Sequence, residues 1–311
     1  MSDDTQYYAN VTNLALCQKC PRLAFYAIFM KRKTNFVGIQ GTGFYGSVFH
    51  SKIAAKFFDA ASDFQNKLNG KIANAIQHGY EAFHELIRKD FFFEFVKSEG
   101  KNYPSSQIYA LAAGTEIWLK VLWEALSEMP SLLKFPREIM PVVFQKQNSG
   151  NMRSSYNLEI AGVQTELTVV GKYDALIFNP DEKQARIFEF KGYKKSDVIV
   201  PLTQSVVYAW LVHEKTGIYP EIEIIHLSES ENPANIFSSD EVREMITSAL
   251  PNLFETICRM YALEEIPPKA YDSRLCEQCK YRNFCEAEIE LFIRNHENTF
   301  ERKNQRENTQ T

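Results

Sequence analysis

The 311-residue sequence has no run of about 18 apolar residues, so no membrane-spanning helix is expected. Residues 1–4 are polar and acidic, which argues against a secretory signal. The chain also shows no internal repeat and no helicase-type phosphate-binding loop of the pattern GxxxxGK followed by Ser or Thr. We therefore expect a cytoplasmic, globular protein without a membrane partner.

An excess of positive charge is also missing. The 35 Lys and Arg residues are outnumbered by 39 Asp and Glu residues, which gives a formal net charge of −4. This balance argues against a generally basic nucleic-acid-binding surface but leaves room for a local basic groove. Two short basic runs, residues 31–33 and Lys191 with Lys194 and Lys195, are interpreted as solvated surface when each is taken alone.

The spacing of apolar residues divides the chain into a helical part and a mixed part. Residues 1–60 and 61–133 favour helices, most clearly over residues 72–88 and 106–129. The aromatic run 91–96 is interpreted as buried core. From Pro136 onward the pattern predicts strands over residues 139–145, 156–161, 166–178, 185–191 and 221–227, and helices over 200–216, ending at Gly217, and 241–263.

Acidic and basic residues interrupt two of the predicted strands. Alternate side chains of a strand share a face, so Glu189 and Lys191 point the same way and Phe190 points into the opposite layer. Asp174 is expected in the middle of the preceding strand. If the two strands are neighbours, Asp174 and Glu189 converge on one cation, and oxygen ligands of this kind suit Mg²⁺ or Mn²⁺.

Such a cation activates water and stabilises charge at a phosphoryl group, with Lys191 orienting the water or neutralising the phosphorus. His50, at the start of an apolar helical run, completes a mixed nitrogen and oxygen metal site. The alternatives are a structural ion pair at Asp174, Glu189 and Lys191 and a core role for His50. The order of the three motifs GxxD, ExK and QxxxY on strand, strand and helix favours function.

Gln204 and Tyr208 form the third motif. They are four residues apart and therefore share one face of the predicted helix. An amide and a phenol at this place are expected to hydrogen-bond phosphate or to stack on a base of DNA. Burial of Tyr208 in the core between helix and sheet is the alternative.

The six cysteines form two separated groups and one isolated residue. Close thiol pairs in a cytoplasmic chain indicate metal binding rather than disulfides. A Zn²⁺ site would use Cys17, Cys20, Cys276 and Cys279, whereas a 4Fe–4S cluster would use Cys20, Cys276, Cys279 and Cys285. Spacing alone leaves both sets open, and Cys258 is interpreted as plain core.

Taken together, these motifs resemble the iron–sulfur branch of the RecB-like PD-(D/E)xK nucleases, most closely its CRISPR-associated adaptation exonucleases. Cys20-Pro21-Arg22 resembles the leading cysteine segment of that branch, and its trailing cysteine trio is matched by Cys276, Cys279 and Cys285. The other matches are His50, Asp174 and Glu189 as metal ligands, Lys191 as the catalytic lysine, and Gln204 with Tyr208 as the DNA-contacting helix motif.

The resemblance implies a mixed α/β (α+β) fold, in which a restriction-endonuclease-like core sheet is flanked by helices. The implied parts are an N-terminal helical segment (1–60), a helical insertion (61–133), a nuclease core (134–263), an iron–sulfur cysteine lobe (264–290) and a flexible tail (291–311). The insertion is longer than in compact members of the CRISPR-associated subfamily, which leaves the biological pathway open.

The implied activity is phosphodiester hydrolysis of DNA, by an exonuclease acting on single-stranded ends in CRISPR adaptation or defence. The implied cofactors are Mg²⁺ or Mn²⁺ and a stabilising 4Fe–4S cluster, with defence or repair proteins as further partners. The alternatives are a DNA-repair nuclease outside CRISPR and a non-catalytic, zinc-binding subunit that binds DNA.

Overall fold

The computed structural model describes residues 5–29, 46–144, 152–179, 183–192, 198–228 and 233–263, together with 267, 270, 273–277, 279, 281–283 and 285. The basic run 31–33, Lys194, Lys195 and the expected tail 291–311 lie outside these residues. Within the described ranges, no helix is both long and apolar enough to cross a membrane.

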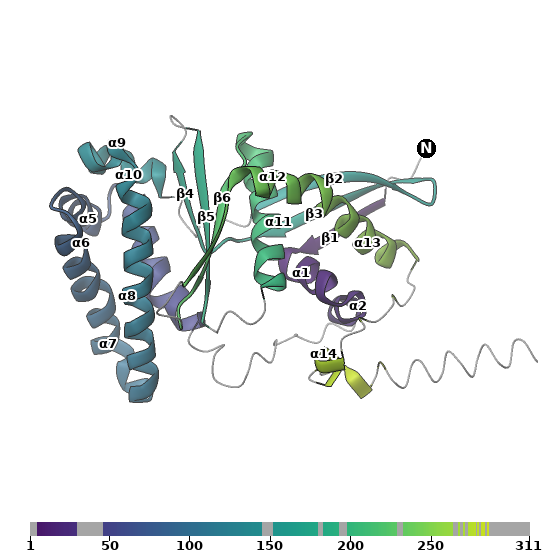
Figure 1. The fold of residues 1–311 in the computed structure, drawn as a ribbon, viewed down its shortest axis with the longest axis horizontal. Coiled ribbons are helices and arrows are strands. Elements are labelled where there is room, and N and C mark those ends of the chain that lie inside the picture. Colours follow the sequence, from purple (N-terminus) through teal and green to yellow (C-terminus); the bar gives the residue numbers. More distant parts are fainter. Residues whose placement is uncertain are drawn as a thin grey trace, which may run out of the picture.

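A four-stranded mixed sheet lies at the centre of the molecule and carries helices on both faces (Figure 1). Strand β5 runs parallel to β6, and the β4–β5 and β6–β7 pairs are antiparallel. The four strands are β4 (Ala175–Asn179), β5 (Gln184–Lys191), β6 (Glu221–His226) and β7 (Ala234–Phe237). This is the mixed α/β architecture expected from the sequence.

The helices between residues 49 and 143 pack on one face of this sheet, at the left of Figure 1. Phe188 and Phe190 point from β5 into this layer, where Phe190 meets Phe49 and Phe49 meets Trp118. The elements are η1 (Phe49–Ala54), α4 (Ala55–Ser62), α5 (Lys67–Gln77), α6 (Tyr80–Leu86), η2 (Ile87–Phe93), α7 (Glu94–Glu99), η3 (Gly100–Asn102), α8 (Ser105–Ser127), α9 (Pro130–Lys134) and α10 (Pro136–Val143).

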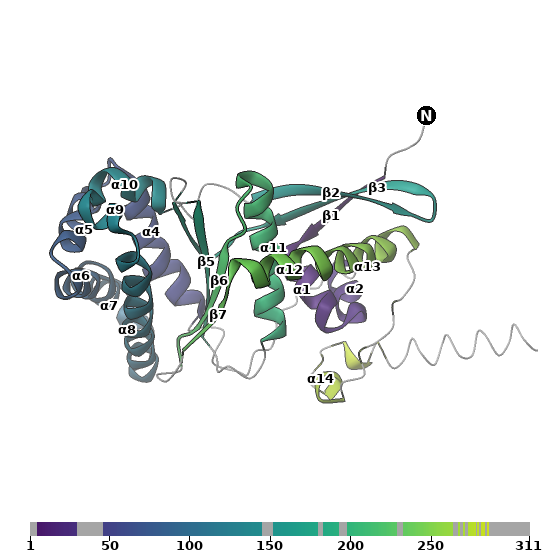
Figure 2. The same cartoon turned by 45° about the horizontal axis from the view of Figure 1, so that its top comes forward.

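Helix α11 (Ile199–Thr216) covers the opposite face and ends at Gly217, whose φ of +72° is the left-handed C-cap predicted for it. A second sheet of order β1-β3-β2 lies beyond α11 (Figures 1 and 2). The remaining elements are β1 (Thr5–Asn10), β2 (Met152–Ile160), β3 (Val163–Gly171), α1 (Val11–Lys19), α2 (Pro21–Phe29), α12 (Ser239–Ser248), α13 (Leu250–Leu263) and α14 (Ser273–Glu277).

The strand predicted for residues 139–145 is wrong, because α10 occupies this segment as far as residue 143. Pro136 stands at the first helical position, where its fixed φ suits a helix. Met140, Val143 and Phe144 are buried at three- and four-residue spacing, which is the period of a helix and not of a strand. Phe144 then forms a single antiparallel bridge with Ile177.

Other predicted elements are divided or were missed. The strand predicted for residues 166–178 is two strands, β3 and β4, which belong to different sheets. The helices predicted for 72–88 and 241–263 are interrupted at residues 78–79 and at Ala249. Strand β1 lies in a segment expected to be helical, and β7 was not predicted. The helices and strands predicted for 106–129, 156–161, 185–191, 200–216 and 221–227 are confirmed within a few residues.

Candidate active site

Asp174 lies in the turn that leads into β4, and not in the middle of a strand as predicted. The antiparallel register places Ala175 opposite Phe188, so the residue before β4 reaches the end of β5 beside Glu189. The carboxylate is held there because its Oδ2 accepts a hydrogen bond of 2.9 Å from the backbone N–H of Phe190. Asp174, in the turn before β4, and Glu189, in β5, thus lie beside each other.

Glu189 and Lys191 share the face of β5 that is turned towards α11, and the phenylalanines on either side of Glu189 enter the opposite core, as the alternation predicted. The Lys191 ammonium donates to Glu189 Oε1 at 2.5 Å and to Gln204 Oε1, on α11, at 3.1 Å. The lysine is therefore held between strand and helix at the end of β5.

Glu189 is buried, with 4% of its surface exposed. Burial and, to a smaller degree, the negative charge of Asp174 raise its pKa to about 8, against the opposing effect of the Lys191 ammonium. Its second oxygen, Oε2, is buried without a hydrogen-bond partner. One ammonium therefore compensates the carboxylate pair only in part, and a further cation would stabilise its charged form.

His50 lies in η1, the helix that packs beside the end of β5. Its Nε2 is 2.9 Å from the carbonyl oxygen of Phe190, and a carbonyl oxygen only accepts, so Nε2 carries the proton. Nδ1 is buried, makes no hydrogen bond and lies 3.3 Å from Asp174 Oδ1, within ion-pair distance. Metal-binding histidines have this arrangement, in which one ring N–H is fixed on a backbone carbonyl.

Among the described residues, no three His, Cys, Asp and Glu side chains form a finished ligand set for a metal ion. Asp174 Oδ2 and Glu189 Oε1 have protein hydrogen-bond partners instead. The two buried atoms left without one, His50 Nδ1 and Glu189 Oε2, are nitrogen and oxygen donors of the kinds that Mn²⁺ accepts. These residues fit a divalent cation in the chemistry of their donor atoms.

The backbone of Phe190 is the part of this site that sequence reasoning missed. Its N–H holds Asp174 and its carbonyl oxygen holds the His50 ring. The two proposed ligands come from segments more than a hundred residues apart, and the same peptide fixes both. Because backbone groups are common to every residue, no sequence signal marks this role.

Gln204 and Tyr208 lie on one face of α11, as their spacing predicted, and Gln204 accepts from Lys191. Tyr208, however, is only 8% exposed. Its pKa is raised by burial and by the charges of Glu189 and Asp174, which places the phenol near the carboxylate pair. The buried ring favours packing between helix and sheet over the predicted stacking on a base.

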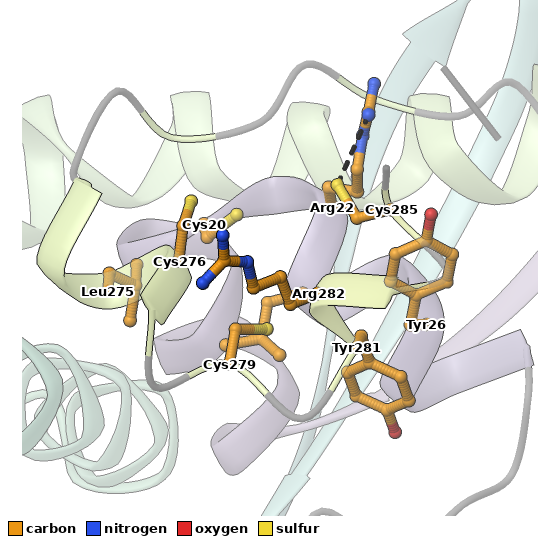
Figure 3. Close-up of a pocket in the computed structure, with 10 residues that line it drawn as sticks. Cys20, Arg22, Tyr26, Leu275, Cys276, Cys279, Tyr281, Arg282 and Cys285 are labelled. Atoms are coloured by element: carbon orange, nitrogen blue, oxygen red, sulfur yellow. Dashed lines mark hydrogen bonds between the residues drawn. The ribbon is translucent and has the colours of Figure 1, made fainter. Parts of the chain in front are cut away.

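The four cysteines of the predicted iron–sulfur set line one small cavity of about 40 Å³, between α2 and the C-terminal residues (Figure 3). Arg22 joins α2 to the C-terminal residues, because its Nε donates to Pro267 O at 2.8 Å and its Nη1 donates to Cys285 Sγ at 3.5 Å. The backbone N–H of Ala270 donates to Cys20 Sγ at 3.4 Å. Cys20, Cys276, Cys279 and Cys285 thus line the same cavity.

The two remaining cysteines lie outside this cavity. Burial raises the pKa of Cys279, and the neighbouring Cys20, Cys276 and Cys285 raise it further, so these three thiols lie within electrostatic reach of Cys279. Cys17 does not line the cavity and is buried in α1, where burial and, to a smaller degree, the nearby Cys20 raise its pKa to about 12. Cys258 is fully buried, as predicted for a core residue.

A helix-flanked mixed sheet, with an acidic pair and a lysine at its strand ends, has the architecture of a metal-dependent nuclease core. The sequence profile of the PD-(D/E)XK nuclease superfamily matches residues 8–286, which is most of the chain. The protein therefore belongs to the PD-(D/E)XK nuclease superfamily.

Two further comparisons add little to this assignment. No curated protein matches the chain. A crystal structure of SSO0001 aligns over 90% of this chain and 86% of its own, with 11% sequence identity and a TM-score of 0.31.

Proposed function

We propose that the protein is a metal-dependent deoxyribonuclease of the RecB-like branch, which hydrolyses phosphodiester bonds at the end of β5. The observation that carries this proposal is the convergence of Asp174, Glu189 and Lys191 beside His50. A structural ion pair would explain Glu189 with Lys191, but it would leave Glu189 Oε2 buried without a hydrogen bond.

His50, Asp174 and Glu189 would hold Mg²⁺ or Mn²⁺, which supplies an activated water and charge stabilisation at the phosphoryl group. Lys191 is oriented by Glu189 and Gln204, so its ammonium is already ordered to face the negative charge that develops at phosphorus. The Phe190 backbone, which binds Asp174 Oδ2 and the His50 ring, would hold both residues in place at the metal site.

We also propose a 4Fe–4S cluster at the cysteine cavity. The cavity includes Cys285 and excludes Cys17, which is the pattern of the iron–sulfur ligand set and not of the zinc set. The N–H donors of Arg22 and Ala270 point at two of the sulfurs, and hydrogen bonds of this kind stabilise the negative charge of a thiolate-bound cluster. The cluster would act as a staple between the two ends of the chain.

The proposed substrate is DNA with single-stranded ends, degraded exonucleolytically, and the proposed setting is CRISPR adaptation or a related antiviral defence. Both rest on the family resemblance of the motifs. Repair of DNA outside CRISPR, and a zinc-binding subunit that binds DNA without cutting it, are the alternatives that experiment must separate.

Digestion of single-stranded and duplex DNA, labelled at either end, tests the proposed activity. Mn²⁺ or Mg²⁺ should support cleavage, and a chelator should stop it. Products that shorten progressively from one end would show an exonuclease, and internal fragments would show an endonuclease. Intact DNA of every form in the presence of either metal would contradict the proposed function and favour the non-catalytic subunit.

A further inference from the structure

Gly171 lies at the end of β3, three residues before Asp174, where three elements meet. A Cβ atom at this position would lie 2.3 Å from Val11 Cγ2, at the start of α1, and 2.7 Å from Tyr208 Cε1, in the middle of α11. Neither distance is tolerated between carbon atoms, since optimal contacts lie near 3.5–4.0 Å. Only glycine allows the Tyr208 ring to come this close to β3.

The distance between α11 and the sheets affects the site, because α11 carries both Gln204 and Tyr208. Gln204, one turn before Tyr208 on the same face, accepts a hydrogen bond from Lys191. Tyr208 is itself buried at 8% exposure, and its phenol lies close enough to Glu189 and Asp174 for both charges to act on it. A shift of the tyrosine ring would therefore move the helix face that holds the lysine and lines the carboxylates.

We propose that the missing side chain at Gly171 leaves the space in which the Tyr208 ring packs. The ring packed there positions Lys191 and the carboxylate pair and does not contact DNA. This inference rests on the proposed function, because it assigns Tyr208 a role at the same metal-binding site. It also gives the first position of the GxxD motif a physical reason. The motif provides the proposed ligand, Asp174, and, at Gly171, the space that allows α11 to pack close to that ligand.

The test compares Gly171→Ala with Gly70→Ala by titration of Mn²⁺ into DNA-free protein. A Cβ at Gly70, in α5, would meet nothing within 4 Å, so this variant is a matched control for the same chemical change. Gly171→Ala should weaken Mn²⁺ binding roughly tenfold or more, the usual loss when groups supporting metal ligands are displaced. DNA binding in chelator should stay within about twofold, since no DNA contact is removed.

Val11→Ala with Gly171→Ala keeps the experiment informative if the single variant does not fold. It removes the 2.3 Å overlap and leaves only the contact with Tyr208. This double variant should still bind Mn²⁺ weakly, and Tyr208→Phe, which retains the ring, should bind it as the unaltered protein does. Restoration of full Mn²⁺ affinity in the double variant would show that Tyr208 has no positioning role.

Two other results would overturn the proposal. One is a lower melting temperature of Gly171→Ala with unchanged Mn²⁺ affinity of the folded protein, which would show that Gly171 has only a structural role. The other is weaker DNA binding of Tyr208→Ala in chelator with unchanged Mn²⁺ affinity, which would make Tyr208 a DNA contact. Failure of the proposed function is separate, because unaltered protein would then neither bind Mn²⁺ nor cut DNA.

Discussion

The acidic site and the cysteine cavity both join distant segments of the chain, but different forces hold them. At the acidic site, strand register brings Asp174 beside Glu189, and backbone hydrogen bonds of Phe190 fix Asp174 and His50. At the cysteine cavity, side-chain contacts such as Arg22 with Cys285 span 263 positions without any sheet between them. The first site is a product of the fold, whereas the cluster proposed at the second would hold the two ends of the chain together.

This difference predicts opposite consequences of mutation. Removing a side chain from the acidic site should change chemistry and leave the sheet intact, because hydrophobic residues on both faces hold β5 in place. Removing a ligand from the cysteine cavity should change stability, because closing so long a loop lowers the entropy of the unfolded chain.

The largest effect is expected from Asp174→Ala. The change removes a proposed metal ligand, so cleavage should fall roughly a thousandfold or more through loss of several kcal/mol of charge stabilisation. The melting temperature should change little, since Asp174 is partly exposed in a turn. Initial rates on labelled DNA and thermal unfolding measure both. Cleavage within about tenfold of the unaltered protein would show that the site is not catalytic.

Lys191→Ala should lower turnover roughly a hundredfold to a thousandfold, the usual loss of one group that stabilises developing charge. DNA affinity should change much less, because the lysine is one charge among several contacts. Lys172→Ala, an exposed lysine in the turn before Asp174, is the matched control and should leave turnover nearly unchanged. Equal losses of turnover and affinity in Lys191→Ala would reduce its role to a phosphate contact.

Cys20→Ala should lose iron, bleach the protein and destabilise it by about 5 kcal/mol, which is the effect expected for opening a cross-linked loop of this length. Cys17→Ala should retain iron and colour, because Cys17 lies in α1 outside the cavity. Metal analysis, the visible absorbance spectrum and denaturant unfolding of anaerobically purified protein measure these changes.

The same pair of variants separates the two cysteine assignments. Iron at about four atoms per chain supports the cluster. Colourless protein with one zinc per chain, or loss of metal in Cys17→Ala, would replace the cluster by a zinc ribbon.

The smallest effect is the pH dependence of stability in chelator. Burial and the charge of Asp174 raise the pKa of Glu189 from 4.5 to about 8, so the folded state holds a proton there that the unfolded chain has lost. Its contribution to the free energy of unfolding is therefore present at low pH and lost as pH rises through this window. Glu189→Gln should flatten the slope by about 1.4 kcal/mol per pH unit at most. Parallel pH profiles of the two proteins would contradict the raised pKa.

The regular spacing of apolar residues predicted individual helices and strands. The alternation in β5 correctly assigned Phe190 to one layer and Glu189 with Lys191 to the other, and the three-to-four spacing identified α8. The segment 139–145 was misassigned because its apolar residues fit both periods over so short a length. Strand β1 was missed because its partner, β3, lies more than 150 residues away.

The candidate site was predictable as a set of residues but not as a geometry. Spacing selected Asp174, Glu189 and Lys191, yet it placed Asp174 inside a strand and gave no sign of the Phe190 backbone. Spacing also left two roles open for Tyr208, a DNA contact or core packing, and only its burial in the structure favours core packing. Conversely, the grouping of the cysteines followed the resemblance of the motifs, and the structure added the exclusion of Cys17.

The central claim is that the acidic site at the end of β5, and not merely a buried carboxylate in the sheet, cuts DNA. Glu189 has a close match in Glu223 on the adjacent strand β6. Each is 4% exposed, burial raises the pKa of each, and each has a basic partner, Lys191 or Arg186. Glu223 lies away from Asp174 and His50, on the face of the sheet where α8 packs.

The most direct measurement is therefore the Mn²⁺-dependent cleavage rate of Glu189→Gln beside that of Glu223→Gln, on the same end-labelled single-stranded DNA. Glu189→Gln should lose cleavage almost completely and Glu223→Gln should keep most of it, with both proteins folded. Equal rates in the two variants, whether high or low, would contradict an active site at Glu189.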